Sequence, residues 1–182
     1  MKKNRDAIYG ENIRLSKAKL LTKDDIVSVQ TFDCGNDVIN NYLKEHACND
    51  PRSATFVIYD TKENQVISYY SLSCSGFVMN HNSHITIYPA VEIKMFAVDD
   101  RYKHIPFSQD DSFTLSDYIF CNVISRVYDF TEKECGADKI ILYSVPRAEN
   151  FYIKNGFIRF QEFMLKSESM FLDGCIPMYM DL

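Results

Sequence analysis

The chain has 182 residues, of which 46% are hydrophobic and 25% are charged. This length and balance predict one globular domain, residues 1–182, and exclude two domains of ordinary size. The 20 basic and 25 acidic side chains give a formal net charge of −5. That charge disfavours a protein held on nucleic acid by its overall field, although a local basic patch remains compatible with it.

Features missing from the sequence disfavour further classes of protein. No run approaches the roughly 20 apolar residues of a membrane span, and no apolar segment follows the basic start, so we expect neither a membrane anchor nor a secretory signal. The six cysteines form no CxxC pair, which favours reduced, buried thiols in a cytoplasmic protein over disulfides. His81 and His84 have no acidic or cysteine partner at ligand spacing, so no metal site is predicted.

The first half of the chain predicts an edge segment, a helix and a β-hairpin, in that order. Residues 2–23 mix basic and acidic side chains and are expected to form an edge strand or arm. Asn36 is a good N-cap for a helix whose apolar residues recur at helical spacing; these are Val38, Ile39, Tyr42 and Leu43. Two β-rich runs, 54–59 and 66–72, flank a short polar turn and therefore predict an antiparallel hairpin.

The second half alternates strands and helices. Residues 91–98 alternate between two faces as a strand does, and a loop follows. The longest helix is predicted over 112–135, with a buried face formed by Leu115, Ile119, Val123, Val127 and Phe130. An apolar strand at 139–145 comes next, and because a helix joins the two strands we expect them to lie parallel. The remaining predicted elements are a short helix and two closing strands, at 147–155, 157–164 and 177–182.

Four motifs on this frame resemble those of a known family. FAVD at 96–99 resembles the end of the fourth strand of the GNAT superfamily of acyl-CoA N-acyltransferases, and NFYIKNGF at 150–157 contains its FYxxxGF motif. FDCG at 32–35 and YYSLS at 69–73 resemble, more narrowly, the GNAT-fold toxins of bacterial toxin–antitoxin pairs. The resemblance implies an α/β fold, with a GNAT-like mixed central sheet of about six or seven strands, about four helices and a splay between the fourth and fifth strands.

The resemblance also implies acetyl-CoA as cosubstrate, but the loop that would hold its pyrophosphate departs from the family. That loop normally reads Q/R-x-x-G-x-G/A and opens into a helix whose backbone N–H groups bind phosphate. Here the stretch is RYKHIPF, without glycine, and two acidic residues follow at 108–111. In one interpretation Arg101, Lys103 and His104 replace the backbone contacts with side-chain charge. In the other, the loop has decayed and the fold serves only for binding.

The same resemblance assigns groups for acetyl transfer to an amine. Tyr152 of the FYxxxGF motif is implied to be the general acid that protonates the departing thiolate, since a phenol of pKa about 10 keeps its proton at neutral pH. The alternative is a core aromatic without a catalytic role. Backbone N–H groups of Phe96, Ala97 and Val98 are implied to polarise the thioester carbonyl. Asn150 either binds the cofactor or caps the short helix.

Glu92 is a second candidate catalytic residue, on the strand that leads to these backbone groups. Some GNAT enzymes that acetylate lysine place a general-base glutamate at the matching position. A carboxylate half-buried in a sheet has a raised pKa and can accept the proton of an ammonium group, directly or through water. The alternative is an ion pair with Lys94 or another cation.

The sequence does not identify the acceptor. The resemblance implies direct transfer from acetyl-CoA to a primary amine, on a small molecule or a protein. Toxin-like relatives acetylate aminoacyl-tRNA, often through strongly basic surfaces, and the net charge of −5 disfavours tRNA as a partner here. A non-catalytic GNAT-fold binding protein is the other alternative, and a homodimer is implied by the resemblance alone.

Overall fold

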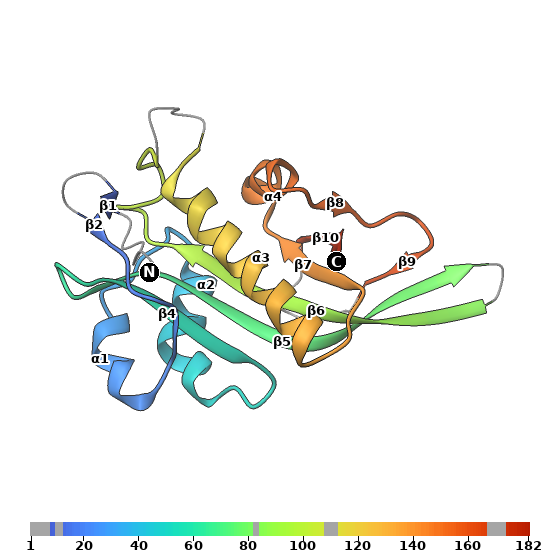
Figure 1. Cartoon of the computed structure of the whole chain (residues 1–182), viewed down its shortest axis with the longest axis horizontal. Coiled ribbons are helices and arrows are strands. Elements are labelled where there is room, and N and C mark those ends of the chain that lie inside the picture. Colours follow the sequence, from blue (N-terminus) through green and yellow to red (C-terminus); the bar gives the residue numbers. More distant parts are fainter. Residues whose placement is uncertain (1–7, 10–12, 82–83, 108–112, 167–173) are drawn as a thin grey trace, which may run out of the picture. The chain divides into compact units, whose positions relative to one another are not determined.

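The structure is a computed structural model that describes residues 8–9, 13–81, 84–107, 113–166 and 174–182. The chain divides into two compact units. The first comprises Met1–Ser71 and Met95–Phe120, and the second comprises Leu72–Lys94 and Cys121–Leu182. Three long elements contribute residues to both units (Figure 1), namely β5 (Gln65–His81), β6 (His84–Val98) and α3 (Leu115–Lys133).

Strands of the first unit follow the order β3-β4-β5-β6. β3 (Lys19–Leu20) pairs antiparallel with β4 (Ala54–Asp60), which places Lys19 opposite Val57. The predicted strands of the hairpin are therefore neighbours, but β5 continues well beyond the predicted end at residue 72 and forms a long hairpin with β6 (Figure 1). Within the predicted edge segment, a short ribbon precedes β3, formed by β1 (Ile8–Tyr9) and β2 (Ile13–Arg14).

Short helices pack the core of the first unit. They are η1 (Lys23–Asp25), α1 (Ile26–Val29), α2 (Asp37–Asn41), η2 (Tyr42–His46) and η3 (Ala47–Asn49). Asn36 caps α2 as predicted, because its Oδ1 accepts hydrogen bonds from the amides of Val38 and Ile39 at 3.1 and 3.3 Å. Tyr42 and Leu43 are buried as expected, whereas Val38 is 53% exposed and lies outside the core.

Helix α3 confirms the long predicted helix with shorter bounds. It begins at Leu115 and ends at Lys133, while the predicted start at residue 112 lies outside the described residues. The predicted face is buried at Leu115, Ile119, Val123 and Val127. Phe130, near the end of the helix, is 39% exposed, so the buried face ends at Val127.

The second unit orders its strands β5-β6-β7-β10-β8, and β9 pairs with β5. Its remaining elements are β7 (Lys139–Ser144), η4 (Pro146–Ala148), α4 (Glu149–Lys154), β8 (Ile158–Arg159), β9 (Met164–Leu165) and β10 (Ile176–Asp181). The predicted strand at 157–164 is therefore divided into β8 and β9. The main sheet has eight strands among the described residues, against the predicted six or seven.

β6 and β7 confirm the predicted parallel pair and its splay. They pair over only three positions, Ala90 with Lys139, Val91 with Ile140 and Glu92 with Ile141. On its other side β7 pairs antiparallel with β10 along its whole length, from Lys139 opposite Asp181 to Ser144 opposite Ile176. Beyond Glu92, β7 therefore keeps one neighbour while β6 and β7 part.

The core of the second unit gathers aromatic rings on one face of its sheet. Phe77 lies 5.1 Å from Tyr179 and 5.3 Å from Phe160 between ring centroids. Ala90 and Ile141 complete the buried cluster. Ala90 of β6 points to this face of the sheet. Because side chains alternate along a strand, Glu92, two positions further on, points to the same face.

The cysteines only partly match their prediction. All six are free thiols, and Cys34 is buried, but Cys74 and Cys121 are exposed and the other three are half-buried. The prediction of buried thiols is therefore wrong for Cys74 on β5 and Cys121 on α3.

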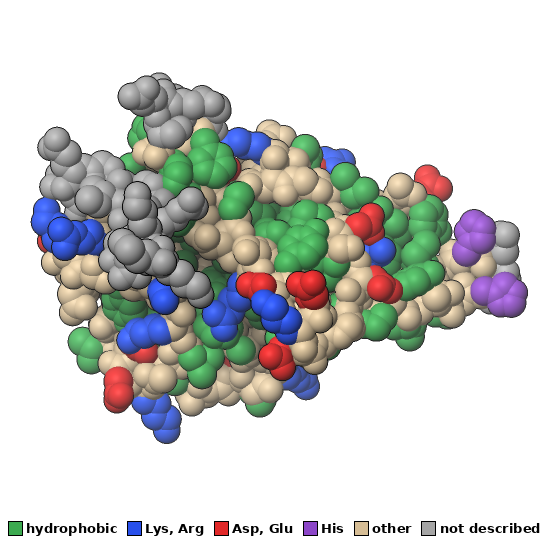
Figure 2. All heavy atoms as spheres, viewed as in Figure 1, with side chains coloured by type: hydrophobic (Ala, Val, Ile, Leu, Met, Phe, Trp, Pro, Cys, Tyr) green, Lys and Arg blue, Asp and Glu red, His purple; other side chains and the backbone are tan. Residues whose placement is uncertain are grey.

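His81 ends β5 and His84 begins β6, where purple side chains mark the end of the hairpin in Figure 2.

Candidate functional site

The FDCG motif forms a tight turn before α2 in the first unit. Phe32 is fully buried, with its ring edge-on to Tyr69 at 5.4 Å. Gly35 adopts a φ of +67°, and a Cβ at this position would lie 2.7 Å from Oδ2 of Asp100. The left-handed backbone favours glycine here, and a Cβ would also displace the exposed Asp100 side chain.

Asp33 fixes this turn through its carboxylate. Its Oδ1 accepts hydrogen bonds from the Gly35 amide and from Nδ2 of Asn40, each at 2.8 Å. These bonds, led by that of Gly35, lower the pKa of Asp33. The Asn40 side chain also accepts the Cys34 amide at 2.9 Å, so the motif and α2 form one hydrogen-bonded unit.

Arg101, predicted to bind the cofactor, is committed to the buried carboxylate of Asp99. Its Nε and Nη2 donate to the two oxygens of Asp99 at 2.8 and 2.9 Å, and Nη1 donates to Gln65 at 2.6 Å. Burial raises the pKa of Asp99, but the bonds from Arg101 and from the Asp33 amide outweigh it, so the pKa is lowered. The guanidinium therefore already has a full carboxylate partner.

Lys103 is likewise paired within the chain. Its ammonium donates to the Cys34 carbonyl at 2.6 Å and forms an ion pair with Asp100. The Asp100 amide donates in turn to the Asp33 carbonyl at 2.9 Å. His104, the third predicted cation, is exposed. Lys103 thus ties the loop after β6 to the FDCG turn, whereas Arg101 ties it to Gln65 of β5.

The start of α3 is closed by its own side chains. Thr114 and Asp117 form a capping box, in which Asp117 Oδ2 accepts the Thr114 amide and hydroxyl, each at 2.8 Å. The Asp117 amide donates to Thr114 Oγ1 at 3.4 Å, and the Leu115 amide donates to the Ile105 carbonyl at 2.8 Å. Three of the four backbone amides from Thr114 to Asp117 are therefore engaged within the chain.

A strap formed by Ile105–Phe107 holds this arrangement in place. The Phe107 amide donates to the Phe113 carbonyl at 2.8 Å, and Pro106 bridges to Thr114. The Phe107 ring stacks on Tyr118 with 4.3 Å between centroids. The predicted insertion at 108–111 lies outside the described residues.

The end of β6 is well ordered by packing. Ala97 and Val98 are buried, and the half-buried Phe96 ring lies 4.8 Å from Phe120. The Ala97 carbonyl accepts the Ser68 hydroxyl at 2.8 Å. The three predicted acyl-binding residues therefore pack within the first unit.

Glu92 occupies the last position at which β6 pairs with β7 in the second unit. It is half-buried, and burial raises the pKa of its carboxyl group, while Lys94 and a hydrogen bond from Ser75 oppose the rise. The charge of Lys94 therefore acts on Glu92, but it does not return the pKa to its ordinary value. A carboxyl group with a raised pKa stands where the two parallel strands part.

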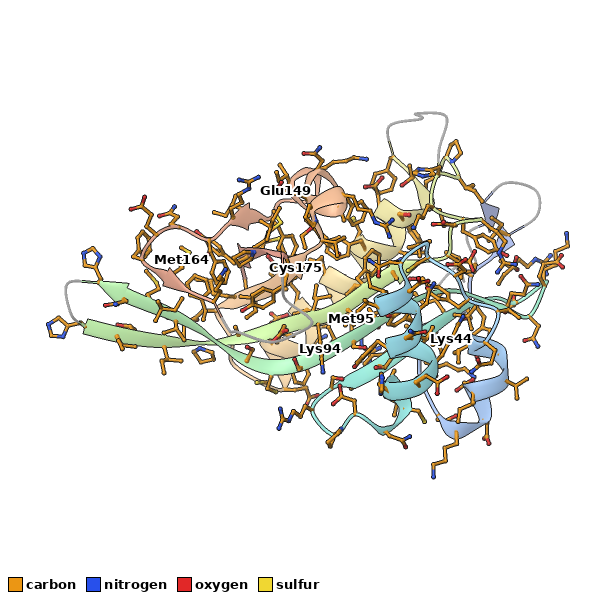
Figure 3. The ribbon with its side chains drawn as sticks, turned by 180° about the vertical axis from the view of Figure 1, so that it is seen from behind. Lys44, Lys94, Met95, Glu149, Met164 and Cys175 are labelled. Atoms are coloured by element: carbon orange, nitrogen blue, oxygen red, sulfur yellow. The ribbon has the colours of Figure 1, made fainter. Side chains whose placement is uncertain are left out.

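Tyr152 is buried on α4, the helix that follows β7. Its ring is edge-on to Phe151 and Phe157, at 5.3 and 6.1 Å between centroids. Burial, with a smaller contribution from Cys175, raises the pKa of its phenol. The phenol therefore retains its proton throughout the neutral range. Cys175 and Glu149, which belong to the same unit, are labelled in Figure 3, seen from behind.

The second unit also contains features that the sequence did not reveal. Glu149 forms an ion pair with Arg159, which joins the start of α4 to β8. Cys175 acts on the Tyr152 phenol although 23 positions separate them in the chain. Asn150 is exposed on α4. By contrast, the T-x-x-D pattern at 114–117 is a capping-box signal that the sequence does contain.

The described residues contain no group of three or more His, Cys, Asp or Glu side chains that could hold a metal ion. Within the same ranges, no helix has both the length and the apolar character needed to cross a membrane.

No family model matches the chain, and no curated protein matches it. Solved structures are similar over most of its length. A bacterial toxin is 18% identical with a TM-score of 0.69, and the match covers 93% of this chain and 91% of that one. A mutant AtaT toxin bound to the C-terminus of the antitoxin AtaR is 19% identical with a TM-score of 0.67, and 92% of each chain is covered.

The KacTA–DNA complex is a further structural neighbour, 17% identical with a TM-score of 0.66, with 92% of this chain and 93% of that one covered. At these identities the likeness establishes the fold. The chain has the mixed α/β fold of the GNAT-fold toxins AtaT and KacT, as the FDCG and FYxxxGF motifs predict.

Proposed function

We propose that the chain is an N-acetyltransferase that moves an acetyl group from acetyl-CoA directly to a primary amine. The observation that carries this proposal is the parting of β6 and β7 after Glu92, with α4 and its buried Tyr152 following β7. Two structural neighbours support the donor and the reaction. AtaTR has been solved with acetyl-CoA, and AtaT has been solved with acetyl-methionyl-tRNAfMet.

In the proposed reaction the acceptor nitrogen attacks the thioester carbonyl carbon. The C–N bond forms, the C–S bond breaks, and the electron pair of that bond leaves on the thiolate. Glu92 takes the proton of the acceptor ammonium, directly or through water, for which its raised pKa is suited. Tyr152 gives a proton to the thiolate and is reprotonated by the second proton, which the acceptor nitrogen loses as the amide forms, and backbone amides of Phe96, Ala97 and Val98 stabilise the negative charge that develops on the carbonyl oxygen.

Tyr152 has additional support from the neighbours. Tyrosine-to-phenylalanine mutants of both AtaT and KacT are among the similar structures. In this chain the FYxxxGF tyrosine is buried on α4, and its neighbour Phe151 contributes a second ring beside it. Tyrosine differs from phenylalanine only by its hydroxyl group, so such mutants probe a chemical role of a tyrosine in those proteins, and we propose that role for Tyr152 here.

The acceptor is a primary amine of a small molecule or a protein, and the α-amino group of an aminoacyl-tRNA is the specific alternative. The AtaT complex with acetyl-methionyl-tRNAfMet favours tRNA, whereas the net charge of −5 opposes it. A non-catalytic binding protein is a second candidate, favoured by the closed start of α3.

The proposal is tested by measuring thiol release from acetyl-CoA in the presence of lysine peptides, small primary amines or methionyl-tRNA. We expect amine-dependent release by the wild-type chain and its loss in Tyr152→Phe. The matched control is Tyr179→Phe, a buried tyrosine of β10 that has no proposed role. No release with any acceptor class would contradict the enzyme and favour the binding protein.

A further inference from the structure

In the described part of the loop after β6, the arginine and the lysine are already engaged by carboxylates. The guanidinium of Arg101 contacts both oxygens of Asp99, and the ammonium of Lys103 contacts Asp100. Asp99 is 1% exposed, so withdrawing Arg101 toward a ligand would leave a buried carboxylate without its cation. Such a rearrangement is costly.

At the described start of α3, three of the four amides from Thr114 to Asp117 already have an acceptor within the chain. The amides of Thr114, Leu115 and Asp117 donate to acceptors within the chain. Asp117 itself is 1% exposed and places a negative charge at the helix terminus where a phosphate would otherwise bind. The capping box thus occupies this position with the chain's own anion.

The sequence of this segment adds the same sign of charge. From Asp99 to Asp117 it holds five aspartates against one arginine and one lysine. The pyrophosphate and the 3′-phosphate of CoA are negatively charged, so this segment repels them at long range as well as denying them contacts. The pantetheine arm and its thioester are uncharged, so the negative charge of this segment does not repel them.

The donor-binding residues at the end of β6 differ from this loop. Ala97 and Val98 are buried, and Phe96 packs on Phe120. A backbone edge and apolar side chains suit an amide-containing, uncharged chain such as pantetheine. The two halves of CoA therefore meet opposite chemical environments.

We infer that this chain recognises its acyl donor through the pantetheine thioester and gains little from the nucleotide half of CoA. The inference rests on the proposed function and names its donor class, the acyl-pantetheine thioesters. Such a thioester occurs free, within CoA, and on the prosthetic arm of a carrier protein. If the loop of an enzyme held the phosphates with two charge-assisted hydrogen bonds, its kcat/KM would fall by at least about 100-fold with a donor that lacks the phosphates.

The test compares kcat/KM for acetyl-CoA and S-acetyl-pantetheine with one amine acceptor and one preparation of wild-type protein. We expect a ratio below about tenfold, a difference of about 1.4 kcal/mol. A ratio above that value would overturn the inference while leaving the acetyltransferase itself intact. Absence of transfer from both donors would instead contradict the proposed function.

A variant of the capping box tests the inference through the same ratio of kcat/KM values. Asp117→Ala removes the carboxylate and frees the Thr114 amide, so the ratio should move toward acetyl-CoA by about two- to fivefold. Because both donors are measured on one preparation, a loss of folded protein cancels in the ratio. Asp129→Ala, an exposed aspartate on the same helix, is the matched control and should leave the ratio unchanged. An unchanged ratio in Asp117→Ala would count against the inference.

Two further measurements extend the test. Millimolar adenosine 3′,5′-bisphosphate, the nucleotide half without the thioester arm, should not inhibit transfer, and competitive inhibition by it would contradict the inference. Acetylated carrier protein is the third donor. Transfer from it within about tenfold of S-acetyl-pantetheine supports a carrier-bound source, and slower transfer supports free thioesters as the source.

Discussion

Two regions of this molecule treat their charged groups in opposite ways. In the loop after β6, Arg101 and Lys103 are neutralised by Asp99 and Asp100. Where β6 and β7 part, Glu92 keeps a raised pKa despite the nearby Lys94. The first region uses its ions to fix the backbone, whereas the second holds a carboxyl group whose raised pKa makes its ionised form a better proton acceptor. The ions of the loop after β6 therefore stabilise the fold, whereas Glu92, where β6 and β7 part, is the group that we assign to the chemistry.

The largest effect is expected from Tyr152→Phe, which removes only the phenolic hydroxyl. If the phenol protonates the thiolate, kcat should fall by roughly 100- to 10,000-fold with little change in donor affinity. The measurement is steady-state thiol release together with donor binding. Tyr179→Phe should retain wild-type kcat. Equal rates for Tyr152→Phe and wild type would remove Tyr152 from the mechanism.

Glu92→Gln tests the second region by pH. In the wild type, activity should rise with pH through the raised pKa of Glu92, because only the carboxylate accepts a proton. In the variant this limb should disappear and the rate should fall by roughly 10- to 100-fold. A pH–rate profile from 5 to 9 is the measurement. A variant that keeps the wild-type limb would assign the titration to another group.

Stability provides an independent check on Glu92. Its folded pKa is raised, so the folded state favours the protonated form, and the contribution to stability is lost as pH rises through the folded pKa. Relative to wild type, Glu92→Gln should therefore become more stable as pH increases. Urea unfolding at acid and neutral pH measures this, and a gain confined to acid pH would be inconsistent with the buried carboxyl group.

Arg101→Ala tests the ion-paired loop. The buried Asp99 would lose its cation, so the free energy of unfolding should fall by about 2 to 4 kcal/mol. Donor affinity per folded molecule should change little, because the guanidinium is already committed. Arg52→Ala, an exposed arginine, is the control. Weakened donor binding at unchanged stability would show that Arg101 binds phosphate instead.

The smallest effect is expected from Gly35→Ala. Its positive φ and the short approach to Asp100 should together cost about 1 to 2 kcal/mol of unfolding free energy. Gly136→Ala is the matched control, since a Cβ there meets no atom within 4 Å. Thermal unfolding of both variants gives the comparison, and equal stabilities would mean that the FDCG turn relaxes freely.

Local patterns in the sequence predicted much of the fold. Asn36 and the apolar residues after it marked a helix start, and the helix between β6 and β7 implied that these strands lie parallel, while their splay followed from the family resemblance. FDCG and FYxxxGF pointed to the fold that the structural neighbours confirm. These features succeed because capping, periodicity and crossover geometry are local or follow from element order.

The loop after β6 shows where sequence reasoning stopped. Arg101 and Lys103 were interpreted as free cations, but their partners include Gln65 and the Cys34 carbonyl, which lie 36 and 69 positions away in the chain. Only the folded arrangement brings these groups together. The Thr114–Asp117 capping box was local and could have been recognised from its T-x-x-D spacing.

The most direct test of the account is a titration of the wild-type chain with acetyl-CoA and, separately, with S-acetyl-pantetheine. Calorimetry records the heat of binding, and thermal unfolding records the change in Tm. We expect binding heat and a raised Tm with both thioesters, since a ligand that binds only the folded state stabilises it. The absence of heat and of any change in Tm at millimolar concentrations of both would contradict it.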